Sequence, residues 1–164
     1  MLEKLRGTAT TPIWTLVRLW LGYEWLTGGI EKLTNGFDAT GFLKGALKGA
    51  TGEHPAVQGW YAAFLKGFAL PNVELFNFIV PIGELLVGLG LIFGTFTTIA
   101  LLAGAFMNLN FMLAGTTSTN PILYTLAVLL LFAGPVAYAW GVDRFMIPWL
   151  KNYLARAFNR EAHN

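Results

Sequence analysis

Long apolar runs separated by short polar turns dominate the chain, and this pattern predicts helices that cross a membrane. Each of the four longest runs can span a hydrocarbon core of about 30 Å at a helical rise of about 1.5 Å per residue. We expect these helices at about residues 12–33, 72–94, 97–114 and 120–139. Because the last two connections are short, the helices that they join should be antiparallel neighbours. The pattern therefore predicts an all-α fold, a polytopic membrane four-helix bundle.

Two further segments are too polar to span a membrane but alternate apolar and charged residues. In the first, glycines interrupt a series of aromatic residues and lysines, which suits a membrane–water interface. We expect two short interfacial helices there, at about 40–49 and 55–68, which form a lid over the outer end of the bundle. The second segment, at about 142–158, should lie along the opposite membrane surface as an amphipathic helix. The whole chain, 1–164, is then one membrane domain.

Composition supports this class and excludes several others. The chain is 55% hydrophobic and 12% charged, and its net charge of +2 gives no reason to expect nucleic acid as a partner. It has no cysteine and two histidines, so we expect no Fe–S cluster, no haem and no metal site within the chain. The expected partner is the lipid bilayer. Basic residues near both ends predict a cell-membrane protein with N and C termini in the cytoplasm.

Several polar residues lie inside the expected spans, where charged groups mark substrate, ion or proton pathways. Counting helical rise from the ends of the spans places Glu24, Glu84 and the pair Asn108 and Asn110 in one layer near the bilayer midplane. Arg18 lies about 9 Å inside the membrane by the same count. We expect its long side chain to reach the layer and keep one glutamate ionised, while the other glutamate exchanges protons. The alternative is that these residues only fasten the helices, through hydrogen bonds of about 0.6 kcal/mol each.

The candidate site residues fall into two groups. The catalytic candidates are Arg18, Glu24 and Glu84. The ligand-binding candidates are Trp20, Lys32, His54, Asn108, Asn110 and Asn120. Lys32 and Asn120 should lie near the outer rim of the site and His54 in the lid. Lys32 could instead be an interface anchor, and His54 a solvated loop histidine.

Three blocks of the chain resemble the DoxX family, also called DoxX/DoxD. They are RLWLGYEWLTGGIEKL, the hairpin IGELLVGLGLIFGTFTTIA, and MNLNFMLAGTTSTNP, and GVDRF follows them near the end. The resemblance implies a four-helix membrane protein that takes part in electron transfer to quinone. The namesake of the family is a subunit of thiosulfate:quinone oxidoreductase, and other members are linked to detoxifying oxidoreductase complexes. It also implies a redox partner protein or a homo-oligomer.

Two functions are consistent with these features. In the first, an apolar slot with aromatic walls holds a quinone, the amides bind its carbonyl groups and the glutamates move protons. The protein would then be a quinone-interacting or electron-transfer subunit of an oxidoreductase system. In the second, the bundle is a non-enzymatic scaffold or a carrier of a small solute, and the polar layer only holds the helices together.

Overall fold

The computed structural model describes residues 7–161, with side chains as far as residue 156. These residues form seven α-helices and no strand, so the all-helical prediction is confirmed. The α-helices are α2 (Thr11–Asn35), α3 (Ala39–Lys48), α4 (Gly59–Phe64), α5 (Val73–Phe93), α6 (Thr97–Leu113), α7 (Asn120–Ala133) and α8 (Asp143–Glu161). Three short helical turns complete the chain: η1 (Thr8–Thr10), the π-helical η2 (Leu65–Ala69) and η3 (Gly134–Ala137).

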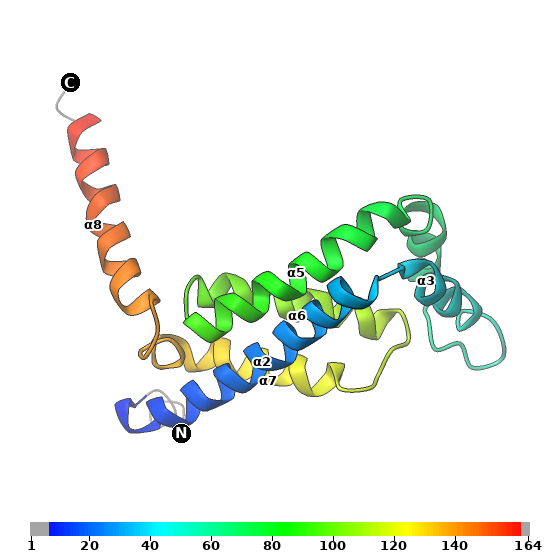
Figure 1. Ribbon diagram of the computed structural model, residues 1–164, viewed down its shortest axis with the longest axis horizontal. Coiled ribbons are helices and arrows are strands. Elements are labelled where there is room, and N and C mark those ends of the chain that lie inside the picture. The colour runs from blue at the N-terminus through cyan, green and yellow to red at the C-terminus, as the bar shows by residue number, and fades with distance from the viewer. Residues whose placement is uncertain (1–6, 162–164) are drawn as a thin grey trace.

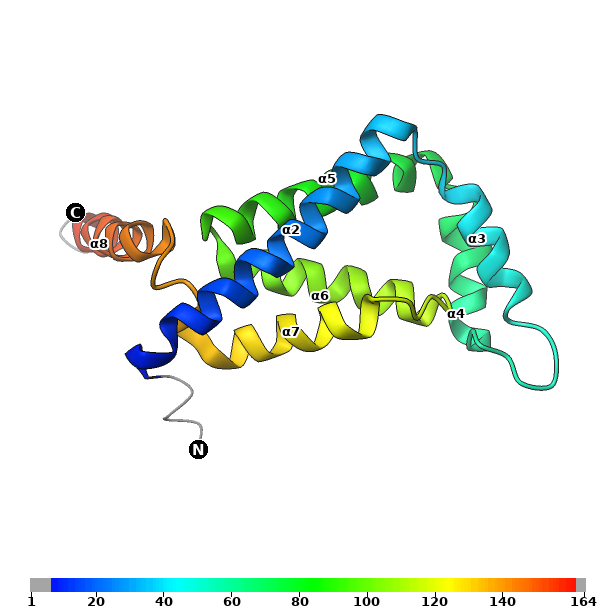
Figure 2. The same ribbon diagram turned by 60° about the horizontal axis from the view of Figure 1, so that its bottom comes forward.

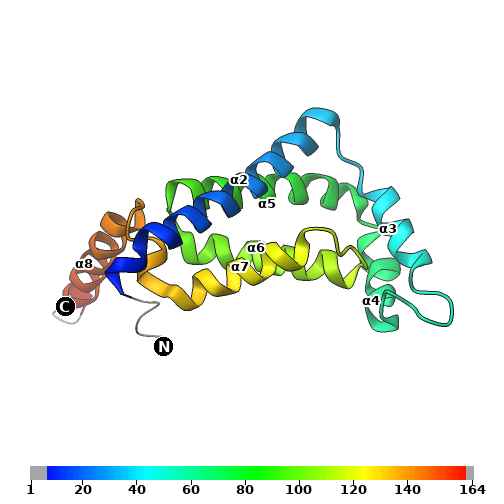
Figure 3. The same cartoon turned by 90° about the horizontal axis from the view of Figure 1, so that it is seen from below.

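The helices α2, α5, α6 and α7 run side by side and form the body of the protein (Figure 1). α2 packs along α5, α5 against α6, and α6 against α7, while α7 returns to α2 (Figure 2). The short helices α3 and α4 lie across one end of this body, and α8 leaves the opposite end (Figure 3). The arrangement thus gives the body two different ends, one covered and one carrying the amphipathic tail.

The contact between α2 and α5 is unusually close because glycines face the partner backbone. A Cβ atom added at Gly88 of α5 would lie 2.5 Å from the backbone nitrogen of Leu26, and one at Gly29 of α2 would lie 2.7 Å from that of Leu85. Small residues at such positions let two helix backbones approach and gain van der Waals contact. Leu26 meets Gly88, whereas Gly29, later in α2, meets Leu85, earlier in α5, so the two helices are antiparallel.

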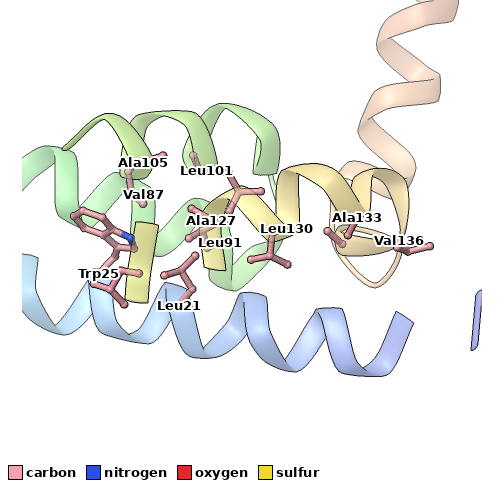
Figure 4. Close-up of a cluster of buried hydrophobic side chains, with 13 residues drawn as sticks. Leu21, Trp25, Val87, Leu91, Leu101, Ala105, Ala127, Leu130, Ala133 and Val136 are labelled. Atoms are coloured by element: carbon pink, nitrogen blue, oxygen red, sulfur yellow. The ribbon is translucent and has the colours of Figure 1, made fainter. Parts of the chain in front are cut away.

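An apolar core fills the space between the four helices (Figure 4). Leu21 and Trp25 of α2 meet Val87 and Leu91 of α5 there, and small residues of α6 and α7 complete the cluster. A second buried cluster lies under the lid and joins α3, α4 and η2 to the end of α6. The lid is therefore packed onto the body.

Hydrogen bonds also tie the lid down at its first helix. The Asn77 Oδ1 atom of α5 accepts from the backbone N–H of Ala39 at 2.8 Å, at the start of α3. The Asp38 carboxylate caps the same helix by accepting from the Thr40 backbone N–H at 2.9 Å. Hydrogen bonding from Thr40 lowers the pKa of the Asp38 carboxyl, so the cap stays ionised near neutral pH.

Two helical segments are long and apolar enough to cross a membrane, Val73–Phe93 with a mean hydropathy of 2.0 and Asn120–Ala137 with 1.7. Only 33% of the 18-residue apolar stretch in each segment is buried, whereas the core helix of a soluble protein is mostly buried. Thr97–Leu113 is apolar but shorter, and α2 carries Arg18, Glu24, Glu31 and Lys32. Large apolar side chains point outward along these helices, among them Phe78, Leu86, Phe93, Ile99, Leu102 and Phe132.

Two helix boundaries differ from the expected ones for local reasons. α7 ends at Ala133, not near residue 139, because Gly134 takes a positive φ of 69° and Pro135 begins a 3-10 turn. The second lid helix begins at Gly59, not at residue 55, because residues 51–58 form a loop that contains Pro55.

The close α2–α5 contact predicts that replacing glycine by alanine has opposite effects on stability inside and outside this contact. Gly88→Ala forces a methyl group against the Leu26 backbone, and we expect it to lower the free energy of unfolding by about 1–3 kcal/mol. Gly45→Ala is the matched control, because Gly45 is helical with no atom within 4 Å of an added Cβ, and alanine there should stabilise by up to about 1 kcal/mol. Thermal unfolding in one detergent, followed by circular dichroism, measures both. Equal stability of the two variants would contradict the close contact.

Candidate functional site

A cavity of about 660 Å³ lies between α2, α5 and α6 on one side and the lid on the other. Its volume is typical of sites for small organic molecules. Its wall combines aromatic and aliphatic side chains with a few polar groups, which is also typical of such sites. The polar and charged lining residues are Glu24, Thr27, Glu31, Lys32, Tyr61, Glu84, Asn108, Asn110, Thr116, Thr119 and Asn120.

An ion pair joins α2 to α5 in this wall. The Lys32 Nζ atom lies 2.8 Å from the Glu84 Oε2 atom, and the two side chains are 29% and 5% exposed. A buried carboxylate requires such a partner, because desolvation of an unpaired charge costs several kcal/mol. Gly28 lies beside the pair, and a Cβ added there would make ordinary van der Waals contacts, at 3.5 Å from Glu84 Oε2 and 3.8 Å from Lys32 Nζ.

Two buried polar groups at the cavity have no hydrogen-bond partner among the described residues. Asn108 is 0% exposed and neither its Nδ2 nor its Oδ1 atom is paired, and Trp25 is 4% exposed with an unpaired Nε1. Leaving such a group unsatisfied costs about 1–3 kcal/mol, so native proteins rarely do it without a reason. The Asn108 amide therefore has an unpaired donor and an unpaired acceptor beside the cavity, whereas Trp25 Nε1 faces α6, where a Cβ added at Gly104 would lie 3.2 Å from it.

Tyr61 of the lid closes the cavity against α6. Its hydroxyl group lies 3.0 Å from Asn110 Oδ1 and 3.1 Å from the Asn110 carbonyl oxygen, and can donate to either. Asn110 in turn donates from Nδ2 to the Phe106 carbonyl oxygen at 2.8 Å, which holds the amide in place. Burial raises the pKa of the Tyr61 hydroxyl, so it stays protonated as a donor.

The structure brings six of the nine candidate residues together at the cavity: Glu24, Lys32, Glu84, Asn108, Asn110 and Asn120. Glu24 is half-buried, and Asn120 donates from Nδ2 to the Thr116 carbonyl oxygen at 3.3 Å. Trp20 and His54 are exposed and do not line the cavity.

Arg18 also lies outside the cavity, and it does not pair with a glutamate. It is 1% exposed, and its Nη2 atom donates to the Trp140 carbonyl oxygen at 3.1 Å. The Asp143 carboxylate attracts the guanidinium group and also caps α6, by accepting from the backbone N–H groups of Phe96 at 2.8 Å and Thr97 at 2.7 Å. Gly94, with a φ of 62°, gives the guanidinium room, since an added Cβ would meet it. Arg18 therefore joins the helix ends opposite the lid.

The register of α2 against α5 explains this difference from the expectation. Counting depth from Pro12 assumed that α2 begins level with the end of α5. In the structure Gly22 packs on Ile92, so about three turns of α2 precede that level. Arg18 consequently falls beside the α5–α6 turn, and Lys32 falls beside Glu84.

Sequence reasoning missed two groups at the cavity, Tyr61 and Trp25, and one at the opposite helix ends, Asp143. Tyr61 was one of several lid aromatics and nothing in its spacing set it apart, and Trp25 was indistinguishable from packing tryptophans. Asp143 carries a usable signal: an aspartate in GVDRF just after the last apolar run can cap a neighbouring helix N-terminus.

Fold and site together describe a helical protein with a lidded, mainly apolar cavity and outward-facing apolar helices. The model of the DoxX family matches residues 13–117, which is more than half of the chain. The chain therefore belongs to the DoxX family, and this membership makes it a membrane protein of the lipid bilayer. None of the curated proteins and none of the solved structures compared with the chain matches it.

The ion pair between Lys32 and Glu84 predicts strong coupling between the two positions. Lys32→Met leaves the Glu84 carboxylate buried without its partner, and we expect a loss of about 1–3 kcal/mol, since Lys32 is partly exposed. Adding Glu84→Gln should recover most of this loss. Lys48→Met, at an exposed lysine of α3, is the control and should change stability by less than about 0.5 kcal/mol. Additive effects of the two substitutions in a thermal-unfolding double-mutant cycle would contradict the pair.

Proposed function

We propose that α2, α5, α6 and the α7–η3 segment all cross the membrane as a four-helix bundle. The support is that all four pack side by side and that apolar side chains face outward along them. The lid then covers the non-cytoplasmic end, and α8 lies along the cytoplasmic surface of the cell membrane. Its exposed Arg144, Lys151 and Arg156 match the excess of basic residues on cytoplasmic segments.

Cysteine labelling tests this topology, because the chain has no cysteine of its own. We expect a cysteine that replaces the exposed Glu53 of the lid loop to react with a membrane-impermeant maleimide in intact cells. A cysteine that replaces the exposed Asn152 of α8 should react only after permeabilisation. Reaction of both from the same side of intact cells would contradict the topology.

For the function, the proposal is that the cavity binds a quinone headgroup and that the protein serves as a quinone-interacting subunit of a membrane oxidoreductase system. The observation that carries this is the fully buried Asn108 amide, unpaired at both polar atoms, in the wall of a 660 Å³ cavity. A quinone ring is flat and apolar with two carbonyl acceptors. Asn108 Nδ2 is a donor that fits such an acceptor, and the aromatic walls fit the ring.

Other residues of the cavity have roles that suit this ligand. When bound, a quinone supplies an acceptor for two electrons and two protons. Glu24 and the Lys32–Glu84 pair are groups that can hold and release protons at the cavity wall. The lid, held by Tyr61, covers one side of the cavity, and the burial of Asn108 strengthens hydrogen bonds made there. Electrons must come from a partner protein or cofactor outside this chain, because the chain offers no redox-active thiol.

Quinone retention tests the proposal. We expect the protein, reconstituted with a quinone of the host membrane, to retain it in near-equal molar amount, and Asn108→Leu to lower retention at least about tenfold by removing the amide donor. Asn152→Leu on the surface of α8 is the matched control and should retain quinone like the unchanged protein. The measurement is mass spectrometry of extracted lipids after purification in mild detergent. Retention that is equal in both variants would favour the scaffold or solute-carrier function.

A further inference from the structure

The charge balance of the cavity wall is acidic. Its lining includes three carboxylates, of Glu24, Glu31 and Glu84, and a single ammonium group, of Lys32. Lys32 is already bound to Glu84 at 2.8 Å. Glu24 and Glu31 have no ion-pair partner in the part of the chain that the structure describes. Together with Thr27 they form one polar face over about two turns of α2. This face lines the open side of the cavity, where Glu31 and Thr27 are exposed and Glu24 is half-buried.

The wall around these carboxylates is rich in aromatic rings that attract cations. The phenylalanines that line the cavity are Phe37, Phe42, Phe64, Phe76, Phe106 and Phe111. One of them already faces a cation, because the Lys32 Nζ atom lies 5.8 Å from the centre of the Phe37 ring. Ring faces attract organic ammonium groups through their quadrupole, most strongly where water is excluded.

A separate feature indicates that the cavity holds a ligand at all. The Asn108 side chain is fully buried at the cavity and both of its polar atoms lack a partner. A metal ion is a poor candidate for this ligand. Within residues 7–156, no three His, Asp or Glu side chains are placed to hold one, and Ca²⁺ takes six to eight oxygen ligands.

From these observations we propose that the Glu24–Thr27–Glu31 face of α2 is a binding site for a small organic cation, an ammonium group on an apolar body. The carboxylates would attract the charge, the phenylalanine rings would surround its methyl or methylene groups, and Asn108 would bind a polar group further inside. This goes beyond the quinone proposal, because a quinone headgroup is neutral and depends on Asn108. A simple anion is disfavoured in the same cavity by the two free carboxylates.

The test compares three probes of similar size on the full-length protein in lipid nanodiscs, by equilibrium dialysis with lipid-only nanodiscs subtracted. The probes are benzyltrimethylammonium, its uncharged carbon isostere neopentylbenzene, and the anion benzylsulfonate. We expect the ammonium probe to bind at least about tenfold tighter than the isostere, and the anion to bind most weakly. Equal binding of the ammonium and the isostere would overturn the proposal without any variant.

Substitutions then test whether Glu24 and Glu31 cause the preference for the ammonium probe. Glu24→Gln and Glu31→Gln should each weaken binding of the ammonium probe about fivefold while leaving the isostere unchanged. Glu53→Gln, in the exposed loop outside the cavity, is the matched control and should bind all probes as the unchanged protein does. An ammonium preference that survives the double substitution would overturn the assignment. Both proposals use Asn108, but the quinone test measures the effect of Asn108→Leu on retention and the cation test measures the effects of Glu24→Gln and Glu31→Gln on probe binding. Either proposal can therefore fail without the other.

Discussion

The antiparallel contact between α2 and α5 is the constraint on which the rest of the structure depends. Gly88 and Gly29 bring the two backbones so close that a single methyl group would clash with main-chain atoms. Backbone atoms cannot move aside as a flexible side chain can, so the contact allows one register. That register places Lys32 beside Glu84 and thereby determines which charged groups share the cavity.

The same register divides the charged residues of α2 between two tasks. Lys32, Glu31 and Glu24 face the cavity near the lid, where they set its charge. Arg18 lies near the other end and binds the Trp140 carbonyl oxygen beside Asp143. Because Asp143 also caps α6, this cluster joins α2, the α5–α6 turn and the start of α8. Arg18 thus stabilises the fold away from the site, whereas Lys32 joins α2 to α5 and, with Glu24 and Glu31, also defines the site.

The lid covers one end of the helices and forms one wall of a cavity that stays open on another side. Its apolar cluster and its hydrogen bonds to Asn77 and Asn110 hold it on the body. A membrane protein has little hydrophobic gain from helix packing, so polar contacts of this kind contribute much of its specificity. Burial also lowers the dielectric around the unpaired Asn108 amide, which strengthens a hydrogen bond that this amide makes with a ligand.

The sequence by itself determined the helices, the two polar segments and most of the polar residues of the site, because apolar run length and helical rise are local properties. It could also show that Glu84 and Asn108 lie deep in apolar helices and need partners. Only the tertiary structure decided which residues lie next to them. The position of a residue along one helix does not show how far that helix is shifted along its neighbour. The shift of α2 along α5 places Lys32 beside Glu84, where we had expected Arg18. The role of Tyr61 likewise arises where the lid meets α6, between residues 49 positions apart in the chain.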